Sequence, residues 1–149
     1  MIRKAKITDV KEMQKLINLY ASRDMMLART LVELYENLRD YFVCEEGGKI
    51  VGTCALHISW EDLAEIKSLA VEEVKQNKGV GSSLVKEALR EAKEINIKRV
   101  FVLTYKPDFF KKMDFQEIDK ANLPQKIWGE CVNCAKFPGC QETALILSL

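Results

Sequence analysis

Residues 63–95 constrain the fold of this chain most, because a strand there leads into a helix through a short glycine-containing loop. Residues 63–71 hold no helix breaker and alternate between two faces, so Glu65 and Lys67 share one face while Ser68 lies on the other. Beyond Gly79 the apolar residues take the spacing of a helix with one buried face: Val80, Leu84, Val85, Ala88, Leu89, Ala92 and Ile95. The sequence therefore predicts a strand, a loop and a helix in direct succession.

The loop between this strand and helix has the features of an anion site. A helix start presents unpaired backbone N–H groups and the positive end of the helix dipole. Gly79 and Gly81 allow a ligand to approach that backbone closely. Phosphate or pyrophosphate is the natural ligand of such a site. Two glycines also suit an ordinary strand-to-helix turn, so this pattern alone does not distinguish an anion site from such a turn.

The residues before this unit predict a strand at 2–7 and two helices. Asp9 and Glu12 have the spacing of a capping box, and the following apolar residues mark one helix face: Val10, Met13, Leu16, Ile17 and Tyr20. Residues 22–30 are irregular and predict a mobile loop, and residues 31–38 predict a short helix. Gly47 and Gly48 predict a hairpin between strands at 41–46 and 49–57, because a two-glycine turn accepts the positive φ angles that tight hairpins need.

The residues after the helix continue the sheet. Residues 99–104 are apolar, β-branched and aromatic, which predicts a central strand buried on both sides. With the strand at 63–71 and the helix between them, they form a right-handed parallel crossover. Pro107 ends this strand, a short helix is expected at 108–113, Phe115 begins an extended segment, and 143–149 predicts a last strand. We expect one mixed α/β domain over residues 1–149.

Composition excludes several classes of function. The formal net charge of +1 gives no electrostatic reason to expect nucleic acid or a membrane surface as a partner. No apolar window reaches membrane-spanning length, and the start lacks the apolar core of a signal peptide, so we expect a cytoplasmic protein. The chain has five cysteines, and Cys44 and Cys54 lie in expected strands as small apolar side chains, which suits a reducing compartment.

The loop at 76–81 resembles a known family. Gln76-Asn-Lys-Gly79-Val-Gly81, placed five residues after Val71, is similar to the coenzyme A loop of the GNAT superfamily of N-acetyltransferases, Gln/Arg-x-x-Gly-x-Gly/Ala. The order of elements resembles that fold over nearly the whole chain. The resemblance implies an α/β (α+β) GNAT-like domain: a mixed, mostly antiparallel central sheet flanked by helices, with the strands at 63–71 and 99–104 as its parallel pair.

Four segments, 27–36, 63–71, 103–107 and 128–144, resemble the short, stand-alone bacterial N-acetylglutamate synthases. This resemblance implies transfer of acetyl from acetyl-CoA to the α-amine of L-glutamate, the first step of arginine biosynthesis, by direct attack in a ternary complex. Two alternatives stay open. One is a GNAT enzyme for another amine, such as another amino acid, a polyamine or a protein N-terminus, and the other is a non-catalytic module that binds acyl-CoA or metal. The oligomeric state is open too, a homodimer included.

Two positions depart from the superfamily pattern. Asp114 stands before Phe115 where a glycine is common, and an aspartate can adopt the left-handed conformation needed there. Phe110 stands where a tyrosine often acts as general acid, and a phenyl ring cannot donate a proton.

The resemblance implies a backbone site for acetyl-CoA. An N–H of Leu69 or Ala70 would meet the thioester oxygen, and the pantetheine arm would pair with the exposed edge of the strand ending at Val71. The pyrophosphate would lie on the N–H groups of residues 76–82, with charge added by Lys78; the candidates are Gln76, Lys78, Gly79, Val80, Gly81 and Ser82.

The remaining candidates are side chains. Glu65, six residues before Val71, is the candidate base, although it could simply pair with Lys67. Tyr105 is the candidate acid, although it could be a packed ring. The two carboxylates of glutamate call for cations, and the candidates are Arg29 with its bidentate fork and Lys67, with Ser68 donating if a bulge turns it to that side.

Three late cysteines have a spacing compatible with zinc: Cys131, Cys134 and Cys140. A structural zinc site ordinarily has four ligands, and the fourth could be His57, the single histidine, or Glu142. The plainer interpretation, which we favour, is that three reduced thiols pack a loop under the acceptor pocket and that no metal is bound.

Overall fold

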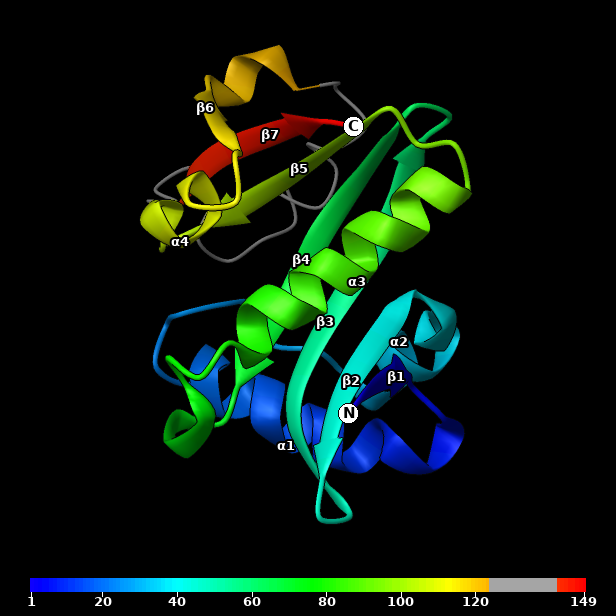
Figure 1. The fold of residues 1–149 in the computed structure, drawn as a ribbon. Coiled ribbons are helices and arrows are strands. Elements are labelled where there is room, and N and C mark those ends of the chain that lie inside the picture. The colour runs from blue at the N-terminus through cyan, green and yellow to red at the C-terminus, as the bar shows by residue number, and fades with distance from the viewer. Residues whose placement is uncertain (124–141) are drawn as a thin grey trace.

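The computed structural model describes residues 1–123 and 142–149, and within them the chain forms a seven-stranded sheet in the order β1-β2-β3-β4-β5-β7-β6 (Figure 1). The strands are β1 (Ile2–Lys4), β2 (Tyr41–Glu46), β3 (Lys49–Trp60), β4 (Leu63–Val71), β5 (Arg99–Thr104), β6 (Gln116–Ile118) and β7 (Thr143–Ser148). Only β4 and β5 pair in parallel in this sheet, and every other neighbouring pair is antiparallel. The mixed, mostly antiparallel sheet with that parallel pair is therefore confirmed.

The helices cover both faces of the sheet. They are α1 (Val10–Ala21), α2 (Leu31–Glu36), α3 (Val80–Glu94) and α4 (Pro107–Lys111), with 3-10 turns at Ile7–Asp9, Leu38–Asp40, Glu73–Lys75 and Lys120–Asn122. Helix α3 crosses one face, and α1 and α2 lie on the other (Figure 1). Within the described residues, no helix is long and apolar enough to cross a membrane.

The two faces of the sheet are packed differently. Under α3 a single cluster of buried side chains extends from β2 to β7, and it includes Cys54, Ile66, Leu84, Val100 and Leu145. On the opposite face the buried side chains form two clusters, one under α1 and α2 and one around β5 and β7. Among the described residues, the core is therefore continuous on one side of the sheet and divided on the other.

The N-terminal predictions need correction. Strand β1 ends at Lys4, and Ile7 lies 60% exposed in a 3-10 turn. Asp9 makes no capping bond to α1, because its carboxylate accepts two bonds from the Arg3 guanidinium, at 2.7 and 3.0 Å, and one from the Lys6 N–H. Glu12 accepts the N–H of Ile50 instead. The expected capping box is therefore wrong: these carboxylates tie α1 to the sheet.

The central predictions are confirmed with small differences. β4 and β5 have the expected bounds, while β3 runs on to Trp60. Gly47 and Gly48 take φ values of +58° and +77°, as the tight turn requires. Asp114 takes φ +72°, as its place in the motif predicted. Ile95 follows the end of α3 and is 45% exposed, so it is wrongly assigned to the buried face.

Strand β4 contains a bulge beside its polar residues. Thr53 pairs with Ala70 and Ala55 pairs with Lys67, so β4 has one more residue than β3 between these pairs. Ser68 lies in this interval with φ +54°, an uncommon value for a residue with a side chain. A bulge re-aims side chains and bends the strand. Ser68 is therefore displaced from the simple alternation of the strand.

Candidate active site

The site begins where β4 and β5 part. They pair only from Leu63 with Arg99 to Ile66 with Val102, and beyond these residues the two strands diverge (Figure 1). β4 is thus a central strand, with β3 on one side and β5 on the other. Only at residues 67–71 is the side of β4 that faces away from β3 not paired with β5. Unpaired backbone N–H and C=O groups of a strand accept an added extended chain.

A polar stripe lies between the two core clusters on the face opposite α3. Ala55 belongs to the cluster under α1 and Leu63 to the cluster around β5. Between them on this face come His57, Glu65 and Lys67, each partly exposed, and His57 is in register with Glu65. The structure therefore brings the candidate base and the candidate cation onto one accessible face.

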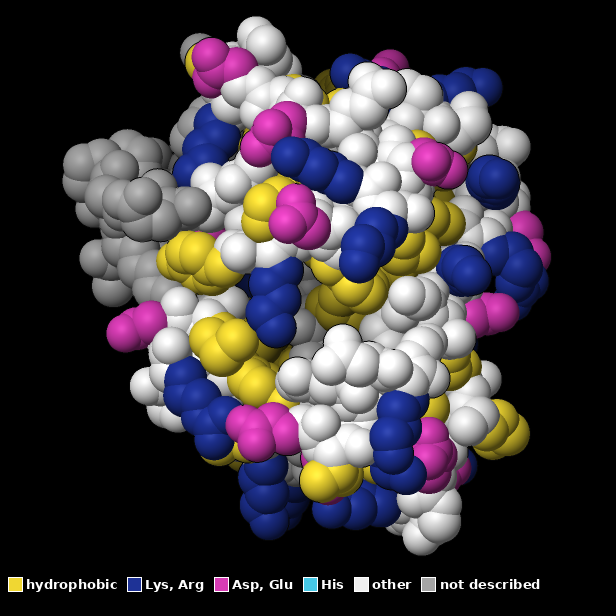
Figure 2. Space-filling view, turned by 60° about the vertical axis from the view of Figure 1, so that its left-hand side comes forward, with side chains coloured by type: hydrophobic (Ala, Val, Ile, Leu, Met, Phe, Trp, Pro, Cys, Tyr) yellow, Lys and Arg dark blue, Asp and Glu magenta, His cyan; other side chains and the backbone are white. Residues whose placement is uncertain are grey.

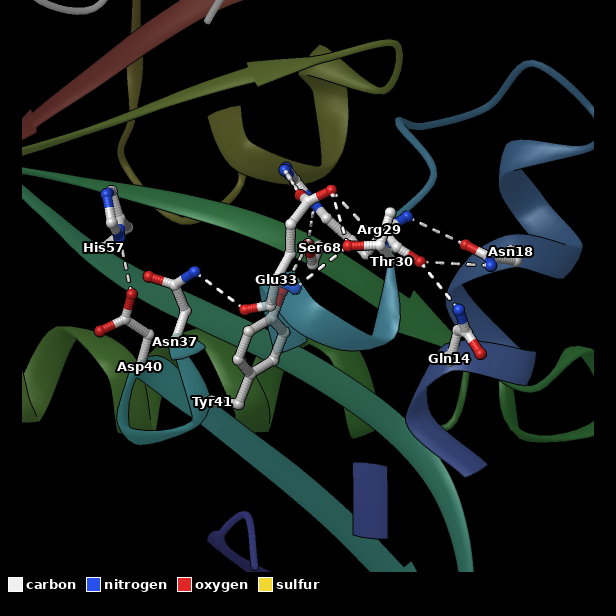
Figure 3. Close-up of polar contacts among 10 residues, drawn as sticks. All are labelled: Gln14, Asn18, Arg29, Thr30, Glu33, Asn37, Asp40, Tyr41, His57 and Ser68. Atoms are coloured by element: carbon white, nitrogen blue, oxygen red, sulfur yellow. Dashed lines mark hydrogen bonds and ion pairs between the residues drawn. The ribbon is translucent and has the colours of Figure 1, made fainter. Parts of the chain in front are cut away.

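Arg29 lies against the bulge, as Figure 3 shows. Its Nε donates to Ser68 Oγ at 3.2 Å, and the Tyr41 hydroxyl donates to the same oxygen at 3.1 Å. Nη1 of Arg29 lies 3.4 Å from Glu33 Oε2, and the arginine side chain is only 12% exposed. Burial raises the pKa of Tyr41, so its phenol remains neutral and can donate to Ser68. The bulge thus brings Ser68 into contact with Arg29, and both were predicted to bind the substrate.

Residues of α1 hold the backbone of Arg29. Asn18 accepts the Arg29 N–H through Oδ1 at 3.0 Å and donates to the Arg29 carbonyl through Nδ2 at 3.4 Å, while Gln14 Nε2 donates to that carbonyl at 3.2 Å (Figure 3). Thr30 and Glu33 then form the capping box that starts α2. Sequence reasoning missed Asn18, Gln14 and Tyr41, although the Thr-x-x-Glu pattern after Arg29 was visible.

The glycine loop has the geometry of an anion cradle. Gly79 takes φ +85°, which suits glycine, and α3 follows at once without an acidic residue in its first turn. The side chain of Gln76 turns back to donate to the Val71 carbonyl at 3.0 Å and to the Tyr20 hydroxyl at 2.8 Å. Gln76 therefore fixes the loop against the end of β4, and Lys78 is exposed beside it.

The remaining predicted residues lie further along β5 and α4. Tyr105 follows β5 and is half-buried. Phe110 is buried, with edge contacts to Phe109 at 4.9 Å and Phe115 at 5.3 Å between ring centroids. Phe110 is therefore a core residue in this structure.

Cys131, Cys134 and Cys140 lie outside the described residues. Among residues 1–123 and 142–149, no group of three His, Cys, Asp or Glu side chains could hold a metal ion. Nδ1 of His57 lies 2.6 Å from Asp40 Oδ2. Packed thiols, the favoured interpretation, and zinc, the alternative, therefore both stay predictions for these three cysteines.

The surface over this region fits a ligand with two kinds of group. On the face drawn in Figure 2, hydrophobic side chains gather near the middle, and Lys and Arg side chains lie around them with Asp and Glu side chains in between. An apolar middle suits an aliphatic arm, and the basic side chains near it can contact phosphates. A parted strand, a glycine loop at a helix start and such a surface are the features expected of a site for an acyl-CoA thioester. The class of protein indicated is thus an acyltransferase.

Comparisons with known proteins agree with this class. The model of the acetyltransferase (GNAT) family matches residues 10–115, so the chain belongs to that family. It is 40% identical over 148 residues to an uncharacterized N-acetyltransferase of Chlorobaculum tepidum, covering 99% of this chain and 96% of that one. An amino-acid acetyltransferase of Mycobacterium tuberculosis is 35% identical over 133 residues, 87% of this chain and 76% of the other.

A solved structure adds a bound cosubstrate. N-acetylglutamate synthase from Neisseria gonorrhoeae, complexed with coenzyme A and N-acetyl-glutamate, superposes with a TM-score of 0.91 at 25% identity. The match covers the whole of this chain and 35% of that one. The chain is therefore a GNAT acetyltransferase that uses acetyl-CoA.

Proposed function

We propose that the protein transfers the acetyl group of acetyl-CoA to the α-amine of L-glutamate. The observation that carries the proposal is the Arg29 guanidinium, which is only 12% exposed and lies against Ser68 in the bulge of β4. Its planar fork of N–H donors matches the two oxygens of a carboxylate, which it can bind in a bidentate arrangement.

The names of relatives support an amino-acid substrate. The Mycobacterium tuberculosis relative is an amino-acid acetyltransferase, and the Neisseria gonorrhoeae structure contains N-acetyl-glutamate. A polyamine would instead call for acidic residues around the acceptor pocket. Arg29 and Lys67 favour an anionic acceptor over a cationic one.

The residues have the following roles in the proposal. Arg29 and Ser68 bind one carboxylate of glutamate, and Lys67 attracts the other. Acetyl-CoA supplies the activated acetyl group. Glu65 accepts a proton from the substrate ammonium, so that the nitrogen can form the new C–N bond as the C–S bond breaks. An N–H of Leu69 or Ala70 stabilises the negative charge that develops on the thioester oxygen.

Proton balance completes the scheme. An ammonium substrate and acetyl-CoA yield an amide, coenzyme A as a thiol, and one proton that leaves the site. Tyr105 is the candidate to protonate the departing thiolate, and water can do so as well. Glu65 is the candidate first acceptor of the proton that leaves.

Release of free thiol from acetyl-CoA tests the substrate. Purified protein receives acetyl-CoA and one of several amines: L-glutamate, L-glutamine, L-aspartate, spermidine or a peptide with a free N-terminus. Glutamate should give the highest kcat/KM. Glutamine, spermidine and the peptide lack its side-chain carboxylate or its α-carboxylate, and aspartate carries its second carboxylate on a side chain that is one methylene group shorter. If glutamate releases no thiol while another amine does, the proposed substrate is wrong.

Variants test the binding roles. Loss of a hydrogen bond to a charged group costs about 1.5–3 kcal/mol, so Arg29→Ala should raise the KM for glutamate by roughly 10- to 150-fold and leave the KM for acetyl-CoA within about twofold. Lys67→Ala should act in the same direction. Arg23→Ala is the matched control, because Arg23 forms a surface ion pair with Glu73. Equal changes in both KM values would argue against these roles.

A further inference from the structure

We propose that Asp40 and His57 form a proton relay that receives the proton from Glu65 and delivers it to solvent. The inference rests on the acetyltransferase activity and on Glu65 as the base, and it does not depend on which amine is the acceptor. The sequence suggested His57 only as a possible zinc ligand.

The first observation is the Asp40–His57 contact. Oδ2 of Asp40, in the 3-10 turn before β2, lies 2.6 Å from Nδ1 of His57 on β3 (Figure 3). A carboxylate can only accept a hydrogen bond, so the neutral imidazole carries its hydrogen on Nδ1. Nε2 then carries the lone pair. This arrangement orients the ring and stabilises the imidazolium that forms when Nε2 takes up a proton.

The second observation is the register of β3 and β4. His57 and Glu65 are directly opposite each other in this antiparallel pair. Side chains of opposed residues point to the same face, with Cβ atoms about 4.5–5.5 Å apart. The imidazole is thus the cross-strand neighbour of the candidate base.

The third observation is exposure. The His57 side chain is 40% exposed, and that of Asp40 is 26% exposed. His57 therefore reaches water from the same stripe that holds Glu65.

The transfer balances at each step. An N–H bond of the substrate ammonium breaks as an O–H bond forms on Glu65. That O–H bond then breaks as Nε2 of His57 gains a hydrogen, which makes the imidazolium paired with Asp40. The imidazolium finally gives the hydrogen on Nε2 to water, and both side chains return to their starting forms. One proton leaves for each acetyl group transferred, as the overall reaction requires.

The tautomer of His57 gives a test that does not involve activity. The chain has a single histidine, so its ring nitrogens are the only imidazole signals in a ¹⁵N NMR spectrum of tag-free protein. We expect the neutral ring to be in the Nδ1–H form in the wild type, and Asp40→Ala to lose this preference. A neutral ring with its hydrogen on Nε2 would overturn the proposal, because that nitrogen could not accept a proton.

Chemical rescue tests the role in turnover, with whichever amine gives the most thiol release. Proton transfer by a positioned side chain contributes about 10²–10⁴-fold, and a relay that water can partly replace should contribute near the lower end. We expect His57→Ala to lower kcat about 10- to 100-fold with KM values within about twofold, and added imidazole to restore much of that loss. Imidazole should not restore Glu65→Gln.

Controls separate this result from misfolding and from a wrong substrate. Asp40→Asn should lower kcat, while Asp62→Asn, the same change at an exposed pair with Arg99, should not. His57→Gln covers the case in which His57→Ala fails to fold. An unchanged kcat in both His57 variants, or a loss that imidazole does not restore, would overturn the relay. Failure of glutamate alone would reject only the proposed substrate.

Discussion

Asn18→Ala tests whether α1 positions the arginine of the acceptor site. The change removes two hydrogen bonds to the Arg29 backbone, at 3.0 and 3.4 Å, and leaves the bond from Gln14 to the Arg29 carbonyl. Each bond contributes about 0.5–1.5 kcal/mol, so about 1–3 kcal/mol of positioning is lost. At about 1.4 kcal/mol per factor of ten, the KM for glutamate should rise by roughly 5- to 150-fold if the whole loss falls on substrate binding.

The assay is steady-state thiol release with glutamate and acetyl-CoA varied separately. Asn37→Ala is the matched control, because Asn37 Nδ2 donates at 2.9 Å to the Glu33 carbonyl in the same region without touching Arg29. Asn18→Ala should change the KM for glutamate selectively, and Asn37→Ala should change only stability. A KM for glutamate within twofold of the wild type, or an equal rise for acetyl-CoA, would refute the reasoning.

Three further outcomes follow from packing and charge. Gly52→Ala should lower the free energy of unfolding by about 1–3 kcal/mol in urea titration, because its Cβ would lie 2.9 Å from Leu84 Cδ1, whereas Gly81→Ala, 3.4 Å from the Phe109 ring, should be nearly neutral. Burial raises the pKa of the Cys54 thiol to about 12, so mass mapping after iodoacetamide at pH 8 should find Cys54 unmodified in native protein and modified in urea. The Arg3 guanidinium holds the pKa of Asp9 below its ordinary 3.8, so this pair stabilises the fold fully above that pH and less as the pH falls. The free energy of unfolding of Asp9→Asn, measured in urea, should therefore depend less on pH than that of the wild type between about pH 4 and 2.

Local patterns carried most of the fold. The alternation at 63–71, the helical spacing after Gly79 and the glycine turn at 47–48 each depend on neighbours in sequence, and the strand, the helix and the turn were confirmed, apart from the side chains of Ser68 and Ile95. The capping box failed for two reasons: Arg3, six residues before Asp9, binds the carboxylate that a cap would use, and Glu12 accepts the N–H of Ile50, 38 residues further along the chain. Sequence spacing cannot reveal such competition.

The site was harder to predict for the same reason. Arg29 and Ser68 are 39 residues apart in sequence, and they meet only because β4 bulges and α1 holds the backbone of Arg29. The contact between His57 and Asp40 depends on a 3-10 turn that no periodic pattern marks. Roles for Glu65, Lys67, Tyr105 and the loop residues remain predictions that the proposed assays address.

The unequal packing of the two sheet faces bears on how the molecule can flex. Among the described residues, the core under α3 runs unbroken across the sheet, whereas on the opposite face it is divided where β4 and β5 part. A small separation of β4 from β5 would therefore break fewer of these buried contacts on the divided face than on the α3 face. The polar stripe of His57, Glu65 and Lys67 lies on the divided face, which leaves these side chains more room to rearrange around a substrate than a continuous core would.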